Sequence, residues 1–124
     1  MRDIKFRGKV IATGKWVCGC LTRYSEHMSL ITEDLIEGKM YEVKTETVGQ
    51  YVGQKDDRGK EIYEGDIVYY EAEEDNFVVL WDEITSRFTL KSEGLIIDFD
   101  NCYSEELDII GNIYENPEQV RWYS

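Results

Sequence analysis

The fold is decided by residues 49–68, which read GQYVGQKDDRGKEIYEGDIV. Turn residues and strand residues alternate along this stretch. Residues 56–60 predict a tight turn, because an aspartate side chain can accept hydrogen bonds from backbone amides two residues on and Gly59 tolerates a positive φ. A second turn at residues 64–66 precedes the β-branched and aromatic run of residues 67–70. Strands joined by two such turns are typical of the entry into a small β-barrel.

The rest of the chain also favours strands over helices. Residues 16–24 alternate along a strand, which puts Trp16, Cys18 and Cys20 on one face, and further short runs are residues 77–81, 87–90 and 95–99. One helix start is predicted at residues 116–118, where Asn116 can cap and proline fits the first helical position, leading into a short helix or turn. Residues 25–46 and 71–75 have the loosest pattern.

Three segments of the chain resemble a known family. The pattern QYxGxxDxxGKEIYEGDIV at residues 50–68 resembles the central signature of the YopX-like family of small phage and prophage proteins of unknown function. The opening MRDIKFR and residues 109–118, IIGNIYENPE, resemble the two ends of that family. Residues 25–46 match nothing in it. The motif positions to which we assign a structural role are Asp56, Gly59, Tyr63, Glu64, Gly65, Asp66, Gly111 and Asn112.

This resemblance implies a mainly β fold with little helix. It implies an SH3-like barrel in the C-terminal half, an N-terminal β subdomain, the cytoplasm of a bacterial host and self-association. It implies no activity and no catalytic residues. We treat residues 1–124 as a single YopX-like domain, and leave open a subdivision into an N-terminal β region, 1–48, and a barrel region, 49–124.

The composition fits one small cytoplasmic domain. The chain has 124 residues, of which 42% are hydrophobic, with three cysteines and one proline. A chain of this length buries roughly two-thirds of the surface that it exposes when unfolded. No apolar run approaches the ~20 residues of a membrane span, and no charged-then-apolar leader is present. We therefore expect a reduced, cytoplasmic protein without membrane contact.

The charge is unevenly spread along the chain. The formal net charge is -12, but residues 1–23 carry six Lys or Arg against Asp3 alone, and residues 61–118 carry 17 Asp or Glu against Arg87 and Lys91. Because the acidic segment repels phosphates, no direct nucleic-acid binding is expected. Three interpretations stay open: solvated faces, contact between the basic and acidic regions within or between chains, and a carboxylate array that mimics DNA.

One set of residues has the chemistry of a zinc site. Cys18 and Cys20 point the same way in a strand, and with Cys102 and His27 they could supply three thiolates and an imidazole. Zinc sites usually use a Cys-x2-Cys turn instead. Buried, small, hydrophobic cysteines therefore explain this pattern better, and we predict no metal and no cofactor.

Other chemistry has weaker support. Asp98 and Asp100, which face one way, could hold Mg²⁺ with Asp108 as in two-metal nucleases, but solvated carboxylates on a strand are far commoner. His27 is the only histidine and lies in a loop-like stretch, which favours an exposed, non-catalytic side chain. The sequence has no phosphate-binding loop, dinucleotide fingerprint or nucleophile elbow. We therefore predict no enzyme activity.

Aromatic residues are numerous and have two interpretations. They could form a surface that binds peptides or single strands, or they could fill the core, which is the better interpretation for rings on strands of an acidic domain. The residues concerned are Tyr51, Tyr63, Tyr69, Tyr70, Trp81 and Tyr114.

These patterns together predict an accessory protein of a phage or prophage that acts by protein contact. Its partner is expected to be a second copy of the chain or an unidentified phage or host protein. An acidic DNA mimic that occupies a host nucleic-acid enzyme, and a metal-dependent nuclease, are the alternatives from other classes. The sequence identifies no partner and no stage of the phage cycle.

Overall fold

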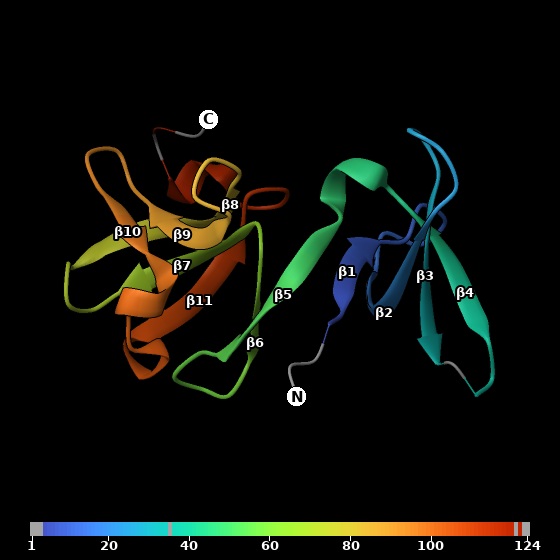
Figure 1. Cartoon of the computed structure of the whole chain (residues 1–124), viewed down its shortest axis with the longest axis horizontal. Helices are drawn as coiled ribbons and strands as arrows, with labels where there is room; N and C mark the ends of the chain where they lie inside the picture. The colour runs from blue at the N-terminus through green and yellow to red at the C-terminus, as the bar shows by residue number, and fades with distance from the viewer. Residues whose placement is uncertain (1–3, 35, 121, 123–124) are drawn as a thin grey trace. The chain divides into compact units, whose positions relative to one another are not determined.

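The computed structural model describes residues 4–34, 36–120 and 122, and strands dominate the described chain (Figure 1). The chain divides into two compact units, Met1–Tyr51 and Val52–Ser124. The boundary falls within strand β5 (Gly49–Lys55), three residues after the subdivision at 48/49 that the sequence leaves open. No helix among the described residues is both long and apolar enough to cross a bilayer.

The first unit is built from antiparallel strands in the order β4-β3-β2-β1-β5. A 3-10 turn, η1 (Thr45–Thr47), follows the fourth strand. The strands are β1 (Phe6–Lys9), β2 (Trp16–Arg23), β3 (Ser29–Asp34), β4 (Lys39–Val43) and the start of β5. The hairpin of β3 and β4 lies in residues 25–46, for which the sequence gives no prediction of shape.

The core of this unit depends on a strand that changes partner at Gly19. The first half of β2 pairs with β1 and the second half pairs with β3. A Cβ atom at Gly19 would lie 2.1 Å from the backbone oxygen of Thr32, so the two strands can approach only with glycine there. An isolated bridge joins Val10 to Val43, and both valines pack with Val17 and Ile31 in the core.

The second unit holds a five-stranded antiparallel sheet in the order β10-β9-β8-β7-β11. The β5–β6 hairpin precedes it. The elements are β6 (Glu61–Tyr63), β7 (Asp66–Tyr70), β8 (Asp75–Asp82), β9 (Arg87–Lys91), β10 (Ile96–Asp98) and β11 (Leu107–Asn112), with 3-10 turns η2 (Phe99–Asn101), η3 (Ser104–Glu106) and η4 (Pro117–Gln119). Strands predicted at residues 77–81 and 87–90 are confirmed, and the strand predicted at 95–99 is shorter.

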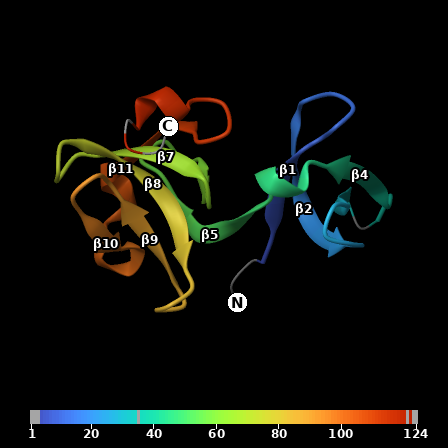
Figure 2. The same ribbon diagram turned by 90° about the horizontal axis from the view of Figure 1, so that it is seen from above.

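Both faces of this sheet are covered. On one face, residues such as Phe77 and Leu90 pack against Val52 and Ile62 from the β5–β6 hairpin. On the other, Ile67 and Val78 pack against residues 120 and 122 of the C-terminal segment, which both views show against the sheet (Figure 2). The consecutive buried residues at the start of β7 and at the centre of β8 follow from this two-sided burial.

The mainly β prediction is confirmed, but a closed barrel is not found within the described residues. The sheet ends at β10 and β11 instead of pairing them. The turn after β5 covers the edge of β11, because the Asp57 N–H donates to the Leu107 oxygen at 2.9 Å and Arg58 Nη2 donates to the Ile109 oxygen at 2.8 Å. With its edge covered in this way, β11 needs no further strand.

The helical prediction at the C-terminal end is confirmed only as a single 3-10 turn. Pro117 opens η4, as expected from its fixed φ. The predicted cap is wrong, since the Asn116 side chain makes no capping hydrogen bond to η4. Its Oδ1 instead accepts a hydrogen bond from the Asn112 N–H at 3.2 Å, which ties the turn to the end of β11.

Candidate functional site around the turn at residues 56–60

The turn between β5 and β6 is organised by one buried carboxylate. Asp56 is 6% exposed, and its Oδ1 accepts hydrogen bonds from the backbone N–H of Arg58 at 3.0 Å and of Lys60 at 2.8 Å. Its Oδ2 accepts from the Ile109 N–H at 3.1 Å. Gly59 has a φ of +80°, so the predicted turn is confirmed together with its positive-φ glycine.

These hydrogen bonds keep the Asp56 carboxyl ionised. Burial by itself raises the pKa of this group, but hydrogen bonds from the amides of Lys60, Ile109 and Arg58 outweigh burial and lower the pKa below its usual 3.8. A charged acceptor also makes each hydrogen bond stronger than a neutral one would be. The carboxylate therefore works as a brace between the turn and β11.

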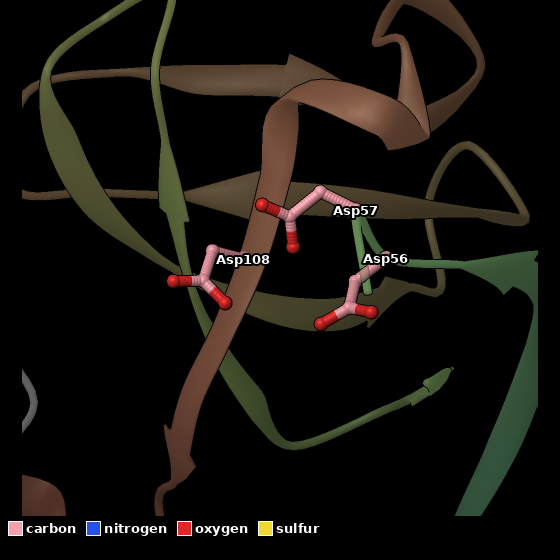
Figure 3. A group of neighbouring side chains, drawn as sticks. All are labelled: Asp56, Asp57 and Asp108. Carbon is pink, nitrogen blue, oxygen red and sulfur yellow. The ribbon is translucent and has the colours of Figure 1, made fainter. Parts of the chain in front are cut away.

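Two further carboxylates lie beside this turn (Figure 3). Oxygens of Asp56, Asp57 and Asp108 lie within 4.8 Å of one another next to β11. Both oxygens of Asp56 already accept backbone hydrogen bonds, and Arg58 Nη2 lies 3.0 Å from Asp108 Oδ1. Because Arg58 forms an ion pair with Asp108 and backbone amides donate to both oxygens of Asp56, the exposed Asp57 is the least engaged of the three. The group is better suited to holding β11 than to binding a divalent cation.

The second predicted turn connects β6 to β7, and its backbone also bonds to β8 and to the chain after β11. The Tyr63 N–H donates to Asp66 Oδ2 at 2.8 Å, and the Asp66 side chain is almost wholly buried. Gly65 has a φ of +94°, its N–H donates to the Val79 oxygen at 2.8 Å, and its oxygen accepts from the Ile113 N–H at 2.9 Å. Glu64 lies beside it, half-buried. This turn therefore connects β8 with the chain after β11.

Gly111 and Asn112 end strand β11, just before the turn at residues 113–115. The register of β11 against β7 shifts between Ile109 and Gly111. A Cβ atom at Gly111 would lie 2.5 Å from Asn116 Oδ1, so a larger residue cannot fit without a shift. Asn112 Oδ1 accepts hydrogen bonds from the N–H groups of residues 114 and 115, both at 3.0 Å. The structure thus places the motif positions in the two turns and at the ends of the strands β6, β7 and β11, where they hold the second unit together.

The aspartates that the sequence offers as candidate magnesium ligands, Asp98, Asp100 and Asp108, do not come together among the described residues. Asp98 forms a hydrogen-bonded ion pair with Arg87, which lowers the pKa of the Asp98 carboxyl, and its Oδ1 accepts from the Asp100 N–H at 3.1 Å. Among the residues placed by the structure, the acidic group that gathers contains Asp108 but neither of these two. Sequence reasoning therefore paired Asp108 with the wrong neighbours, since it lacked the register of β11 against the 56–60 turn.

The candidate zinc ligands, whose spacing in the sequence disfavours a metal site, do not gather either within the described part of the chain. Cys18 and Cys20 are exposed, so the prediction of buried cysteines is wrong for both. The alternation along β2 turns Val17 and Leu21 towards the core, which leaves the cysteines on the outer face. His27 lies in the exposed loop between β2 and β3.

The remaining cysteine has an environment that disfavours reactivity. Cys102 is half-buried beside the Tyr70 hydroxyl. Burial raises the pKa of the Cys102 thiol, although its hydrogen bond with Tyr70 acts in the opposite direction. Burial also raises the pKa of Tyr70 to about 12, assisted by the charge of the thiol and of Glu106. A thiol that stays protonated at neutral pH is a poor nucleophile.

The aromatic residues divide between core and surface. Tyr51, Tyr63 and Tyr70 are buried, which agrees with the interpretation that such rings fill the core. Tyr69 is 38% exposed and Trp81 is 42% exposed. The sequence did not single out Leu95 and Ile96, which lie exposed just before and at the start of the edge strand β10, because an apolar residue on a short strand gives no sign of which face is covered.

Comparisons with known proteins agree on family and fold. The family model described as YopX protein matches residues 5–121. The crystal structure of protein EF1440 from Enterococcus faecalis is similar, with 23% sequence identity and a TM-score of 0.59, over 95% of this chain and 98% of that chain. At this identity the likeness shows the fold alone. No curated protein matches the sequence.

Proposed function

The chain belongs to the YopX family, and we propose that it is a non-enzymatic module that acts by binding another protein. In this proposal it is an accessory protein of a phage or prophage and works in the cytoplasm of the bacterial host. Its partner binds the second unit with a basic, extended segment. The following observations support the proposal.

The main observation behind the proposal is the edge strand β10. It is the last strand in the sheet order, and no strand among the described residues pairs with its outer side. Leu95, just before β10, and Ile96, its first residue, are 40% and 61% exposed. An edge strand offers backbone hydrogen-bonding groups to an added strand, and neighbouring apolar side chains strengthen such a contact. This edge is therefore a suitable place for an extended segment.

The charge of the second unit indicates the kind of segment. Residues 52–124 hold 19 Asp or Glu against six Lys or Arg, a formal charge of -13. A field of this sign speeds the approach of a basic partner and repels an acidic one. The partner segment is accordingly rich in Lys or Arg.

The environments of the carboxylates at the 56–60 turn and of the Cys102 thiol favour binding over catalysis. Asp56 accepts backbone hydrogen bonds on both of its oxygens, Asp108 forms an ion pair with Arg58, and burial raises the pKa of the Cys102 thiol. General acid–base work needs a group whose pKa is near neutral and whose lone pairs can reach a substrate. Asp56 meets neither condition.

Affinity capture from a lysate of the host bacterium tests the proposal. The matched variants are Ile96→Glu at the edge and Ile84→Glu in the β8–β9 turn, where the isoleucine is 95% exposed. Ile96→Glu is expected to abolish capture of the partner, while Ile84→Glu leaves it intact. Equal capture by both variants, or no captured partner at all, would contradict the proposal.

The same charge supports a second candidate, a DNA mimic. In that case the captured protein is an enzyme that acts on nucleic acids, and added duplex DNA releases it by competition. Release by DNA together with insensitivity to Ile96→Glu would favour the mimic over the edge-strand module. Cleavage of DNA that requires Mg²⁺ and is lost in Asp57→Asn would instead identify a nuclease.

A further inference from the structure

A cavity of about 320 Å³ lies on the side of the sheet that the C-terminal segment covers. Its lining residues are Asp75, Asn76, Glu93, Gln119, Val120 and Trp122. The Asn76 side-chain nitrogen donates to the backbone oxygen of Gln119 at 3.1 Å, which ties η4 to β8 and fixes this wall. The volume is at the lower end of ligand pockets, so the cavity suits one side chain rather than a large molecule.

The lining chemistry favours a cation. Asp75 and Glu93 supply two carboxylates, and Trp122 supplies an aromatic ring. Carboxylates and aromatic faces are the groups that hold guanidinium and ammonium ions in proteins. Lys91 Nζ already lies 5.3 Å from the centre of the Trp122 ring, so this ring accepts a cation in the folded protein.

The surrounding charge strengthens this preference. Glu73 and Glu74 precede Asp75 in an exposed turn, and Glu118 precedes Gln119 on η4. Among the described residues, Lys91 contributes a positive charge beside the Trp122 ring, and it offsets only part of the negative charge of these carboxylates. The cavity therefore lies in a negative field, which attracts a cationic side chain and repels an anionic one.

The cavity also adjoins the proposed binding edge. Glu93 belongs to the turn between β9 and β10, which the Ser92 N–H closes by donating to the Leu95 oxygen at 2.8 Å. Ile96 follows at once in β10. A segment that lies along β10 can thus place one side chain near Glu93.

We propose that this cavity binds an arginine side chain of the partner segment. The inference rests on the proposed function, because the arginine belongs to the segment that occupies the β10 edge. Arginine fits better than lysine, because its planar guanidinium can donate to two separate acceptors and stack on an indole at the same time. Asp75 and Glu93 are the acceptors, and the guanidinium stacks on the Trp122 ring in place of Lys91 Nζ.

Titration of the isotope-labelled protein with a short peptide tests the inference by NMR. The probe is capped Gly-Arg-Gly, and its matched control is capped Gly-citrulline-Gly, which has the same shape without the charge. The arginine peptide is expected to shift the indole N–H signal of Trp122 and the side-chain amide signals of Asn76. The citrulline peptide is expected to shift neither. Equal shifts with both peptides would overturn the assignment.

Two variants with the same change of net charge locate the binding. Glu93→Gln is expected to weaken the arginine peptide about two- to fivefold, the range for one exposed ion pair. Glu83→Gln, in the exposed β8–β9 turn, is expected to leave the affinity unchanged. Equal weakening by both variants would show that only the general field attracts the peptide.

The two proposals can fail separately. If the arginine peptide does not bind the cavity while Ile96-dependent capture of a partner persists, this inference is wrong and the proposed function stands. If the peptide binds as expected and the lysate yields no partner, the cavity stands and the proposed function is wrong.

Discussion

Replacing Asp56 by asparagine tests whether the turn at residues 56–60 is braced by a charge. The asparagine oxygen can keep the hydrogen bonds from Arg58 and Lys60, but its NH2 group then faces the Ile109 N–H, so one donor meets another. A hydrogen bond to a charged group contributes about 1.5–3 kcal/mol, and Asp56 is buried. We therefore expect Asp56→Asn to lower the free energy of unfolding by about 2 kcal/mol at pH 7.

Urea denaturation and amide exchange together measure this effect. Besides the lower urea midpoint, exchange of the Ile109 amide hydrogen is expected to quicken, because this N–H loses its acceptor. Asp57→Asn is the matched control: Asp57 is exposed, and its change is expected to stay within about 0.5 kcal/mol. Equal destabilisation by the two variants would refute the claim that the Asp56 carboxylate braces the turn against β11.

The dependence on pH gives a second check with a definite sign. The Asp56 pKa is lower in the folded protein than its usual 3.8, so the stabilisation from its ionised form is present above pH 3.8. It is lost as the pH falls through the lower, folded pKa. The stability difference between the wild type and Asp56→Asn should consequently narrow below about pH 4, since asparagine does not titrate. A difference that stays constant down to pH 2 would contradict this.

Three further predictions concern glycines, thiols and self-association. Gly59→Ala should lower the free energy of unfolding by about 1 kcal/mol, and Gly65→Ala should lower it more, because its Cβ would lie 3.0 Å from the Tyr114 ring. Gly94→Ala is the control, since Gly94 has no positive φ and has open space around it, and it should leave the stability unchanged. Unchanged urea midpoints for both turn variants would contradict this prediction. In a thiol-labelling experiment on the native protein, the two exposed cysteines of β2 should react well before Cys102, and equal rates for all three would show that Cys102 is not protected. Light scattering with gel filtration should show self-association that weakens as salt rises, because charge contacts are screened over about 8–10 Å near physiological ionic strength; a 14.6 kDa monomer under every condition would rule it out.

The turns could be predicted from the sequence because their chemistry is local. Asp56 accepts hydrogen bonds from the amides of residues two and four positions on, and Gly59 and Gly65 supply the positive φ of their turns, so these residue patterns are specific. The acceptor role of Asp56 towards Ile109 could not be predicted, because it joins residues 53 positions apart. That contact depends on the register of β11, which local patterns do not fix. The open sheet could not be predicted for the same reason, because the turn that covers the β11 edge is also far from β11 in the sequence.

From the sequence, the burial of side chains could be predicted only as an alternation between the two faces of a strand. The sequence separates Cys18 and Cys20 from Val17 and Leu21, but nothing local says which face meets the core. The decision comes from partners on other strands, Ile31 and Val43, which pack against Val17. Gly19 between the cysteines is fixed by the backbone of β3, which leaves no room for a Cβ atom. The Cys-Gly-Cys sequence thus reflects strand packing rather than metal binding.

The structural use of the motif determines where the function of this protein should be sought. Asp56, Gly65 and Gly111 bond or fit closely against other strands of the second unit, so substitutions there change folding and binding together. An experiment on these positions cannot separate the two effects. Glu93 and Ile96 are exposed and lie outside the turns at residues 56–66, so their substitution changes the surface without removing a brace. The family motif accordingly explains the fold, and the proposed partner is best tested through the exposed residues of β10 and of the turn before it.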